Sequence, residues 1–241
     1  MQWDIVAVVI GTAMIQSLFG VGVLLFGTPL LLVLGYDFLT ALSILLPISL
    51  TINTLQVMRH LGDIDRQLYL RVLLFAVPCI VLSLFFVARS AVNMLPIVGT
   101  FLLFVAMKGA VPAIDRGLRA MVRFERLYVL AMGIVHGLTN LGGSLLTALV
   151  HSKPFEKDVA RGTTAAAYGT FALFQLATLL VGGTTRFVPV TMALYMALGV
   201  GVFLAADRLL YAKLNTEQFR GVFAIFLFAS GLVLLTKSLL Q

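Results

Sequence analysis

The chain alternates long apolar stretches with short polar connections. Most stretches come close to the roughly 20 residues that a helix needs to cross the hydrocarbon core of a bilayer. They are Ile5–Leu34, Phe38–Met58, Leu68–Ala88, Ala91–Met107, Leu127–Val150, Ala160–Gly182, Val188–Ala206 and Phe219–Leu235. Backbone groups inside a bilayer find no water to bond with, so each stretch is expected to be helical. The pattern predicts an all-α integral membrane protein.

Two of these stretches carry residues that interrupt a helix. Ile5–Leu34 holds 30 residues, about 45 Å of helix, and contains Gly20, Gly22 and Pro29. The fifth stretch carries the run Thr139–Ser144, with sequence TNLGGS, near its middle. Glycine weakens a helix interior and proline removes a backbone donor, so both stretches are predicted to break. The alternative is a pair of straight helices whose glycines only allow close packing.

The two interrupted stretches match when laid over each other about 120 residues apart. Leu18 then falls on Leu138, Gly22 falls on Gly142, and polar Gln16 falls on polar His136. Three simpler apolar stretches follow in each half. Broken segments at corresponding places in two halves are typical of a transporter binding site. We expect a first membrane repeat over residues 1–110, a basic cytoplasmic connection over 111–126, and a second repeat over 127–241.

The positive charges favour a hairpin in the second half. If every stretch crossed the membrane once, the Lys and Arg residues would divide ten to seven between the two sides. If the fifth stretch returns to its own side, fourteen of the 17 fall together, as expected of a cytoplasmic face. Extended to the first stretch, this predicts two inverted repeats, each a re-entrant hairpin plus three transmembrane helices. We therefore expect a multi-pass protein of the inner (plasma) membrane with outward-facing termini.

Composition narrows the function further. The chain is 61% apolar and 11% charged, whereas soluble domains are about one quarter charged. Basic cytoplasmic loops explain the net charge of +7 better than nucleic-acid binding does. We find no catalytic motif and no clustered acids, and three scattered histidines do not form a metal site. The sequence therefore predicts neither an enzyme nor a cofactor.

The polar residues inside the stretches indicate that the bound ligand is a small anion. No Asp or Glu lies mid-stretch, which argues against a cation site. A helix that starts at mid-membrane presents unpaired N–H groups and a positive dipole end, which attract anions. Glycine allows close approach to the backbone. The candidate binding residues are Gln16, Gly20, Gly22, Asn53, His136, Thr139, Asn140, Gly142, Gly143, Ser144, Thr163 and Thr164, with Ser17, Thr51, Tyr168, Thr170 and Gln175 at similar depth.

Each of these side chains could also have a purely structural role. Serine and threonine in membrane helices often bond their own helix, and asparagine often joins neighbouring helices. Arg161 precedes Gly162 and Thr163 and could draw anions to a cytoplasmic mouth.

Glycine patterns in both halves resemble one family. The segment IQSLFGVGVLLFGTPLLLVLGYD (residues 15–37) resembles the glycine-rich opening of the TauE/SafE family of sulfite exporters. GIVHGLTNLGGSLLTALV (133–150), followed by KDVARGTTAAAYG (157–169), is similar to its repeated copy. The resemblance implies movement of sulfite, an organosulfonate or a related sulfur oxyanion, either passive or coupled to an ion.

These observations together predict a transporter of a small anion. The resemblance implies that the anion contains sulfur and that it is exported, while import stays open. The anion would bind at mid-membrane between the two helix breaks and pass by alternating access. A proton or sodium as coupling ion, and a homo-oligomer, stay open. The rival interpretations are a membrane subunit or assembly factor that moves nothing, a transporter of another small organic anion, and an intramembrane enzyme, for which we find no reactive cluster beyond His136.

Overall fold

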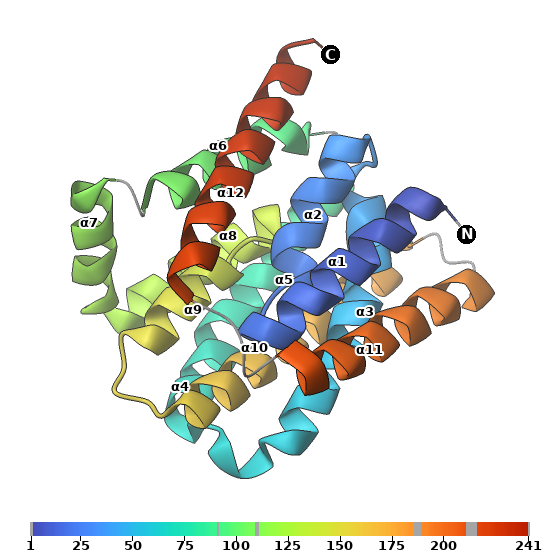
Figure 1. Ribbon diagram of the computed structural model, residues 1–241. Coiled ribbons are helices and arrows are strands. Elements are labelled where there is room, and N and C mark those ends of the chain that lie inside the picture. The colour runs from blue at the N-terminus through green and yellow to red at the C-terminus, as the bar shows by residue number, and fades with distance from the viewer. Residues whose placement is uncertain (1, 91, 109–110, 186–188, 211–215, 241) are drawn as a thin grey trace.

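The computed structural model describes residues 2–90, 92–108, 111–185, 189–210 and 216–240, and every regular element within them is a helix (Figure 1). The expected span starts at Ala91 and Val188, and the repeat boundary at residue 110, lie outside these ranges. The helices are α1 (Trp3–Phe19), α2 (Val23–Leu34), α3 (Phe38–Arg59), α4 (Arg66–Arg71), α5 (Val77–Arg89), α6 (Met94–Lys108), α7 (Pro112–Val122), α8 (Glu125–Thr139), α9 (Gly143–His151), α10 (Lys157–Val181), α11 (Pro189–Leu210) and α12 (Thr216–Leu239).

Four helical segments are long and apolar enough to cross a membrane. They are Phe38–Arg59, Arg66–Arg89, Lys157–Val181 and Pro189–Arg208. The second joins α4 to α5 through a π-helical turn at Val72–Ala76. Pro78 follows this turn and lacks the N–H that a regular α-helix would use, so the wider turn accommodates it. These spans confirm the all-helical membrane architecture.

The first apolar stretch is two helices that fold back on each other. α1 ends at Gly20, which has a left-handed backbone (φ 74°) and donates its N–H to the Gln16 carbonyl. Just after α2, the Tyr36 hydroxyl donates to Asp4 (2.6 Å) and Gln2 (2.9 Å) at the start of α1. The start of α1 and the end of α2 are therefore neighbours, and the stretch is a hairpin with its tip at Gly20–Gly22.

The fifth stretch has the same form. α8 ends at Asn140, also left-handed (φ 61°), whose N–H bonds the His136 carbonyl. Lys153, just beyond α9, donates to Glu125 at the start of α8 (2.5 Å). The Tyr128 hydroxyl also donates to the Leu145 carbonyl of α9 (2.8 Å). Both interruptions predicted from the sequence are confirmed as breaks, and straight helices at these places are excluded.

The two halves interleave rather than stand apart. α3 packs against α10, α1 against α11, and α8 against α5. Gly133 and Gly137 allow the α8 contact, because a Cβ on either would lie 2.5 Å or 2.6 Å from a carbonyl oxygen of the π turn or of α5. Gly99 of α6 and Gly231 of α12 face each other's carbonyl oxygens in the same way. One apolar core therefore spans both halves, while α7, within the predicted basic connection, lies at the edge (Figure 1).

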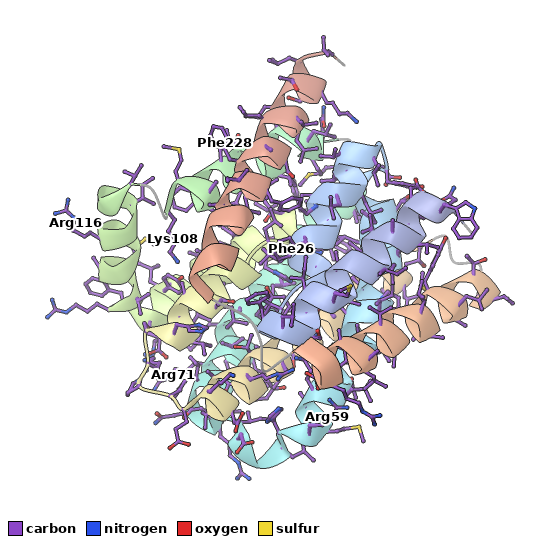
Figure 2. The ribbon with its side chains drawn as sticks, viewed as in Figure 1. Phe26, Arg59, Arg71, Lys108, Arg116 and Phe228 are labelled. Carbon is purple, nitrogen blue, oxygen red and sulfur yellow. The ribbon has the colours of Figure 1, made fainter. Side chains whose placement is uncertain are left out.

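Ion pairs gather at one end of the helices. Figure 2 shows Arg59 and Arg71 at the lower end, away from both chain ends. Asp207 pairs with Arg59 (2.5 Å) and Arg161 (2.7 Å), and Glu125 pairs with Arg71 (2.5 Å). These contacts join helices of the first half to helices of the second half.

Candidate functional site

Gln16 organises the first break. Its side-chain oxygen accepts the N–H of Val23, the first residue of α2 (2.9 Å). Its amide nitrogen donates to Asn53 and to Gln56, both at 3.2 Å. All of these side chains are buried. The protein itself therefore satisfies a donor at the start of α2, one of those that the sequence offered to an anion.

The tip of the first hairpin reaches toward the beginning of α10. A Cβ on Gly20 would lie 3.6 Å from the Arg161 side chain and 3.9 Å from the Gln56 amide nitrogen. The Arg161 guanidinium donates to the Ser17 carbonyl (3.2 Å) and to Asp207. A cation at the carbonyl end of a helix is stabilised by the helix dipole. Arg161 thus holds the end of α1.

The second break repeats the geometry of the first, 120 residues later. A Cβ on Gly22 would lie 2.5 Å from the Gln16 backbone nitrogen and 2.7 Å from the Thr12 carbonyl oxygen. A Cβ on Gly142 would lie 2.5 Å from His136 and 2.9 Å from the Met132 carbonyl oxygen. In both halves the missing side chain lets the loop lie directly on the preceding helix.

The start of α9 differs from the start of α2 in its polar surroundings. No side chain caps α9 within the described residues. The Tyr168 hydroxyl lies over Gly143, at 1.0 Å from where a Cβ would be. Tyr168 is 2% exposed, and its hydroxyl has no hydrogen-bond partner in the part of the chain that is described. A buried donor without a partner costs about 1–3 kcal/mol, so this hydroxyl indicates a place for a polar guest.

His136 occupies the position that matches Gln16 but bonds differently. Its Nε2 lies 3.1 Å from the side-chain oxygen of Gln175 on α10. Its Nδ1 is buried and meets no donor or acceptor among the described residues. The His136 ring lies edge to face with Tyr168, with ring centres 6.1 Å apart. Unpartnered polar atoms therefore gather at the second break.

Asn140 links the second break to the first hairpin. Its side-chain nitrogen donates to the Thr28 hydroxyl of α2 (2.8 Å), and its side-chain oxygen has no partner within the described ranges. Sequence reasoning placed Asn140 among the candidates but missed Thr28 and Gln56. Thr28 lay between a glycine and a proline that indicated only a weak helix, and Gln56 lay near the end of its apolar stretch.

Two of the remaining hydroxyl candidates bond near their own positions, and a third bonds a distant segment. Thr139 donates to the Val135 carbonyl (2.7 Å), and Ser144 donates to the Leu141 carbonyl (3.0 Å). Thr163 accepts the N–H of Asp65 from the loop before α4 (2.9 Å). Thr164 is buried in the same part of α10. The bonds of Thr139 and Ser144 follow the common behaviour of hydroxyls in membrane helices, whereas Thr163 joins α10 to the loop before α4.

The two tips meet α10 at different depths. The first lies beside Arg161 and the second beside Tyr168, about 10 Å apart along the helix at 1.5 Å per residue. Residues Gly20–Gly22 and Asn140–Gly143 are all buried. A surface hollow of about 590 Å³ lies between α6 and α8. It is lined mainly by apolar residues such as Pro96, Phe104 and Leu138, and also by Thr139 of the second break.

A helical membrane protein with two broken hairpins, whose tips carry polar groups between the spans, has the architecture of a secondary transporter. The family comparison supplies the particular class. The family described as Sulfite exporter TauE/SafE matches residues 5–234, so the chain belongs to this family. No curated protein and no solved structure matches the chain. The family resemblance is confirmed, and the chain is a multi-pass membrane protein of a transporter family.

Proposed function

We propose that this protein exports a small sulfur-containing anion, sulfite or an organosulfonate, across the inner membrane. The observation that carries the proposal is the start of α9 at Gly143. An uncapped helix start there meets a buried Tyr168 hydroxyl that has no protein partner in the described chain. Helix starts bind anions through their N–H groups and dipole, and the phenol adds an O–H donor.

The donors in this arrangement are neutral. Backbone N–H groups of Gly142 and Gly143, with the phenol of Tyr168, suit the oxygens of a sulfite or sulfonate group. The Ser144 N–H already donates to the Leu141 carbonyl (3.2 Å), so Ser144 would contribute only through its place beside these donors. Neutral donors avoid the cost of burying a fixed charge when the site is empty. Gln16, Gly20, Gly22 and Asn53 of the first half would form a wall of the site, because the Gln16 amide is already bonded within the protein. His136, Thr139, Asn140, Thr163 and Thr164 would line it from the second half.

Alternating access follows from two inverted halves, residues 1–110 and 127–241, joined by residues 111–126. The matched contacts of Gly22 and Gly142 support this symmetry, as do the packing of α1 on α11 and of α8 on α5. Rocking of one half against the other would expose the buried tips to each side in turn. The Asp207 pairs with Arg59 and Arg161 would open on the cytoplasmic side.

Counterflow in proteoliposomes tests the proposal. Vesicles loaded with unlabelled sulfite should take up radiolabelled sulfite only when they contain the protein, and sulfonates should compete. The Tyr168→Phe variant removes one donor to a charged guest, worth about 1.5–3 kcal/mol. We therefore expect its KM for sulfite to rise roughly tenfold or more.

Tyr36→Phe is the matched control, because it removes the same atom at the outer end of the first hairpin, away from both tips. Its KM for sulfite should stay at the wild-type value. Equal KM values for wild type and Tyr168→Phe would show that the Tyr168 phenol does not bind the anion. Absence of counterflow of sulfite and of every sulfonate tested in the wild type would contradict transport.

A further inference from the structure

His136 has one ring nitrogen in a hydrogen bond and one without. In the orientation that the Gln175 amide has in the structure, its oxygen faces the ring, so Nε2 of His136 carries a hydrogen and donates across the 3.1 Å contact. The Gln175 amide nitrogen is buried and has no partner among the described residues. Nδ1 is then a bare acceptor, buried and unpartnered among the described residues. A lone pair in this position can take either a proton or a hydrogen that a guest brings with it.

The surroundings keep the empty site free of charge. The Tyr168 phenol on α10 lies against the ring at 6.1 Å between centres, and Phe171 covers the ring at 4.8 Å between centres. The charged residues of α8, and of α4, α5, α6 and α10 near it, lie toward helix ends; they include Arg71, Arg89, Lys108, Glu125, Arg126, Lys157, Asp158 and Arg161, with His151 at the end of α9. Arg116 belongs to α7, at the edge of the molecule (Figure 1). No carboxylate among the described residues bonds the ring, so the imidazole is neutral when the site is empty.

We propose that the second break binds its anion together with one proton, and that Nδ1 of His136 holds this proton. The inference rests on the anion site proposed above. The anion supplies the countercharge that the buried imidazole lacks, and the imidazolium gives the anion a charged donor beside the start of α9. The proton comes from the aqueous side that the anion leaves and is released with it on the other side.

The first break takes no proton in this scheme. Gln16, at the position that matches His136, cannot titrate, and both ends of its amide are already bonded to Val23, Asn53 and Gln56. One proton therefore accompanies one anion in each cycle. For a monovalent anion the transported pair carries no net charge.

Methanesulfonate is a suitable probe, because it stays ionised at every pH used and any proton that moves with it must be held by the protein. Proteoliposomes with the membrane potential clamped at zero should accumulate methanesulfonate on the alkaline side. At one proton per anion, the equilibrium ratio is about tenfold for each pH unit of gradient. Counterflow without accumulation would exclude the coupling of a proton to the anion, and the proposed anion transport would remain.

Variants separate the proton from the anion. His136→Gln should reach an equilibrium ratio near one under the same gradient, because glutamine cannot take the proton. Tyr168→Phe, altered in the same site but retaining the imidazole, should exchange more slowly and still reach the tenfold ratio. Accumulation by His136→Gln equal to that of the wild type would assign the proton elsewhere.

Nitrogen NMR tests the residue directly without altering it. His60 and His151, the other two histidines of the chain, are replaced by glutamine, and the remaining histidine carries labelled nitrogen. At slightly alkaline pH, methanesulfonate, or sulfite if only sulfite exchanges, should convert a neutral imidazole signal into an imidazolium signal. A signal that stays neutral while the same protein exchanges the anion would overturn the proposal.

Discussion

Replacing Gly22 by alanine should destabilise the protein far more than the same replacement at Gly11. The new Cβ at position 22 would lie 2.5 Å from the Gln16 backbone nitrogen and 2.7 Å from the Thr12 carbonyl oxygen. Both contacts are about 1 Å shorter than ordinary van der Waals distance, and both partners are backbone atoms of α1 that cannot rotate away. Overpacking of this kind costs about 1–3 kcal/mol.

Gly11 is the matched control because it lies in the same helix, and a Cβ there would meet nothing within 4 Å. Alanine gains about 0.5–1 kcal/mol over glycine inside a helix, so Gly11→Ala should be neutral or stabilising. The two variants should therefore differ by about 2–4 kcal/mol.

The measurement is unfolding in detergent, followed by helical circular dichroism and by retention of monodisperse protein after heating. Gly142→Ala, at the matching position of the second hairpin, should behave like Gly22→Ala, because its Cβ would meet His136 at 2.5 Å. Equal stability of Gly11→Ala and Gly22→Ala would mean that the loop does not lie on α1, and the hairpin geometry would have to be abandoned.

Three further predictions concern the ends and tips of the hairpins. Burial and the carboxylate of Asp4 raise the pKa of Tyr36 from 10.0 to about 12. The contact therefore stabilises the protein fully below pH 10, and this stabilisation disappears toward pH 12. An ultraviolet titration of the wild type should show a tyrosine that ionises late, and this step should be missing in Tyr36→Phe. Burial raises the pKa of Glu125, but hydrogen bonds from Lys153 and Arg71 outweigh this effect and lower the pKa overall. Glu125→Gln should therefore lose about 1 kcal/mol of stability at neutral pH. The difference from wild type should shrink as acid protonates the native carboxylate, and thermal melts across pH would measure it. Asn140, at the tip of the second hairpin, has a left-handed backbone, in which a Cβ is strained and glycine is not. Both Asn140→Ala and Asn140→Gly lose the amide, so Asn140→Ala should be less stable than Asn140→Gly by about 1–2 kcal/mol. Equal melting temperatures would contradict the left-handed backbone.

The breaks could be predicted from the sequence because they depend on local chemistry and on charge. Gly20, Gly22, Gly142 and Gly143 weaken a helix wherever they lie, and the division of Lys and Arg favoured a fifth stretch that returns to its own side. The offset between the halves also located the matched partners of the two glycines. Each of these signals is carried by residues close together in the chain or by simple counts.

The bonding of the tips could not be predicted, because it depends on how far each hairpin reaches. Gln16 looked like a donor to the guest, yet in the folded chain its oxygen caps α2. Thr28 became a partner of Asn140 only because the tip of the second hairpin reaches α2. Sequence spacing sets the length of a half-helix but not the depth at which its neighbours cross it, so these contacts required the packed structure.

In the proposed mechanism, the difference between the two breaks decides how the anion site works. Equivalent glycines place Gln16 and His136 at equivalent points. The Gln16 side chain accepts the N–H at the start of α2, whereas His136 does not cap the start of α9. A perfectly symmetric pair of open breaks would offer two anion sites of the same affinity, and an anion could rest at either. One capped and one open break give a single place to rest, within reach of a residue that can hold a proton. Gln16→His would remove this difference, and we expect it to weaken the cap on Val23 and lower stability by about 1–3 kcal/mol.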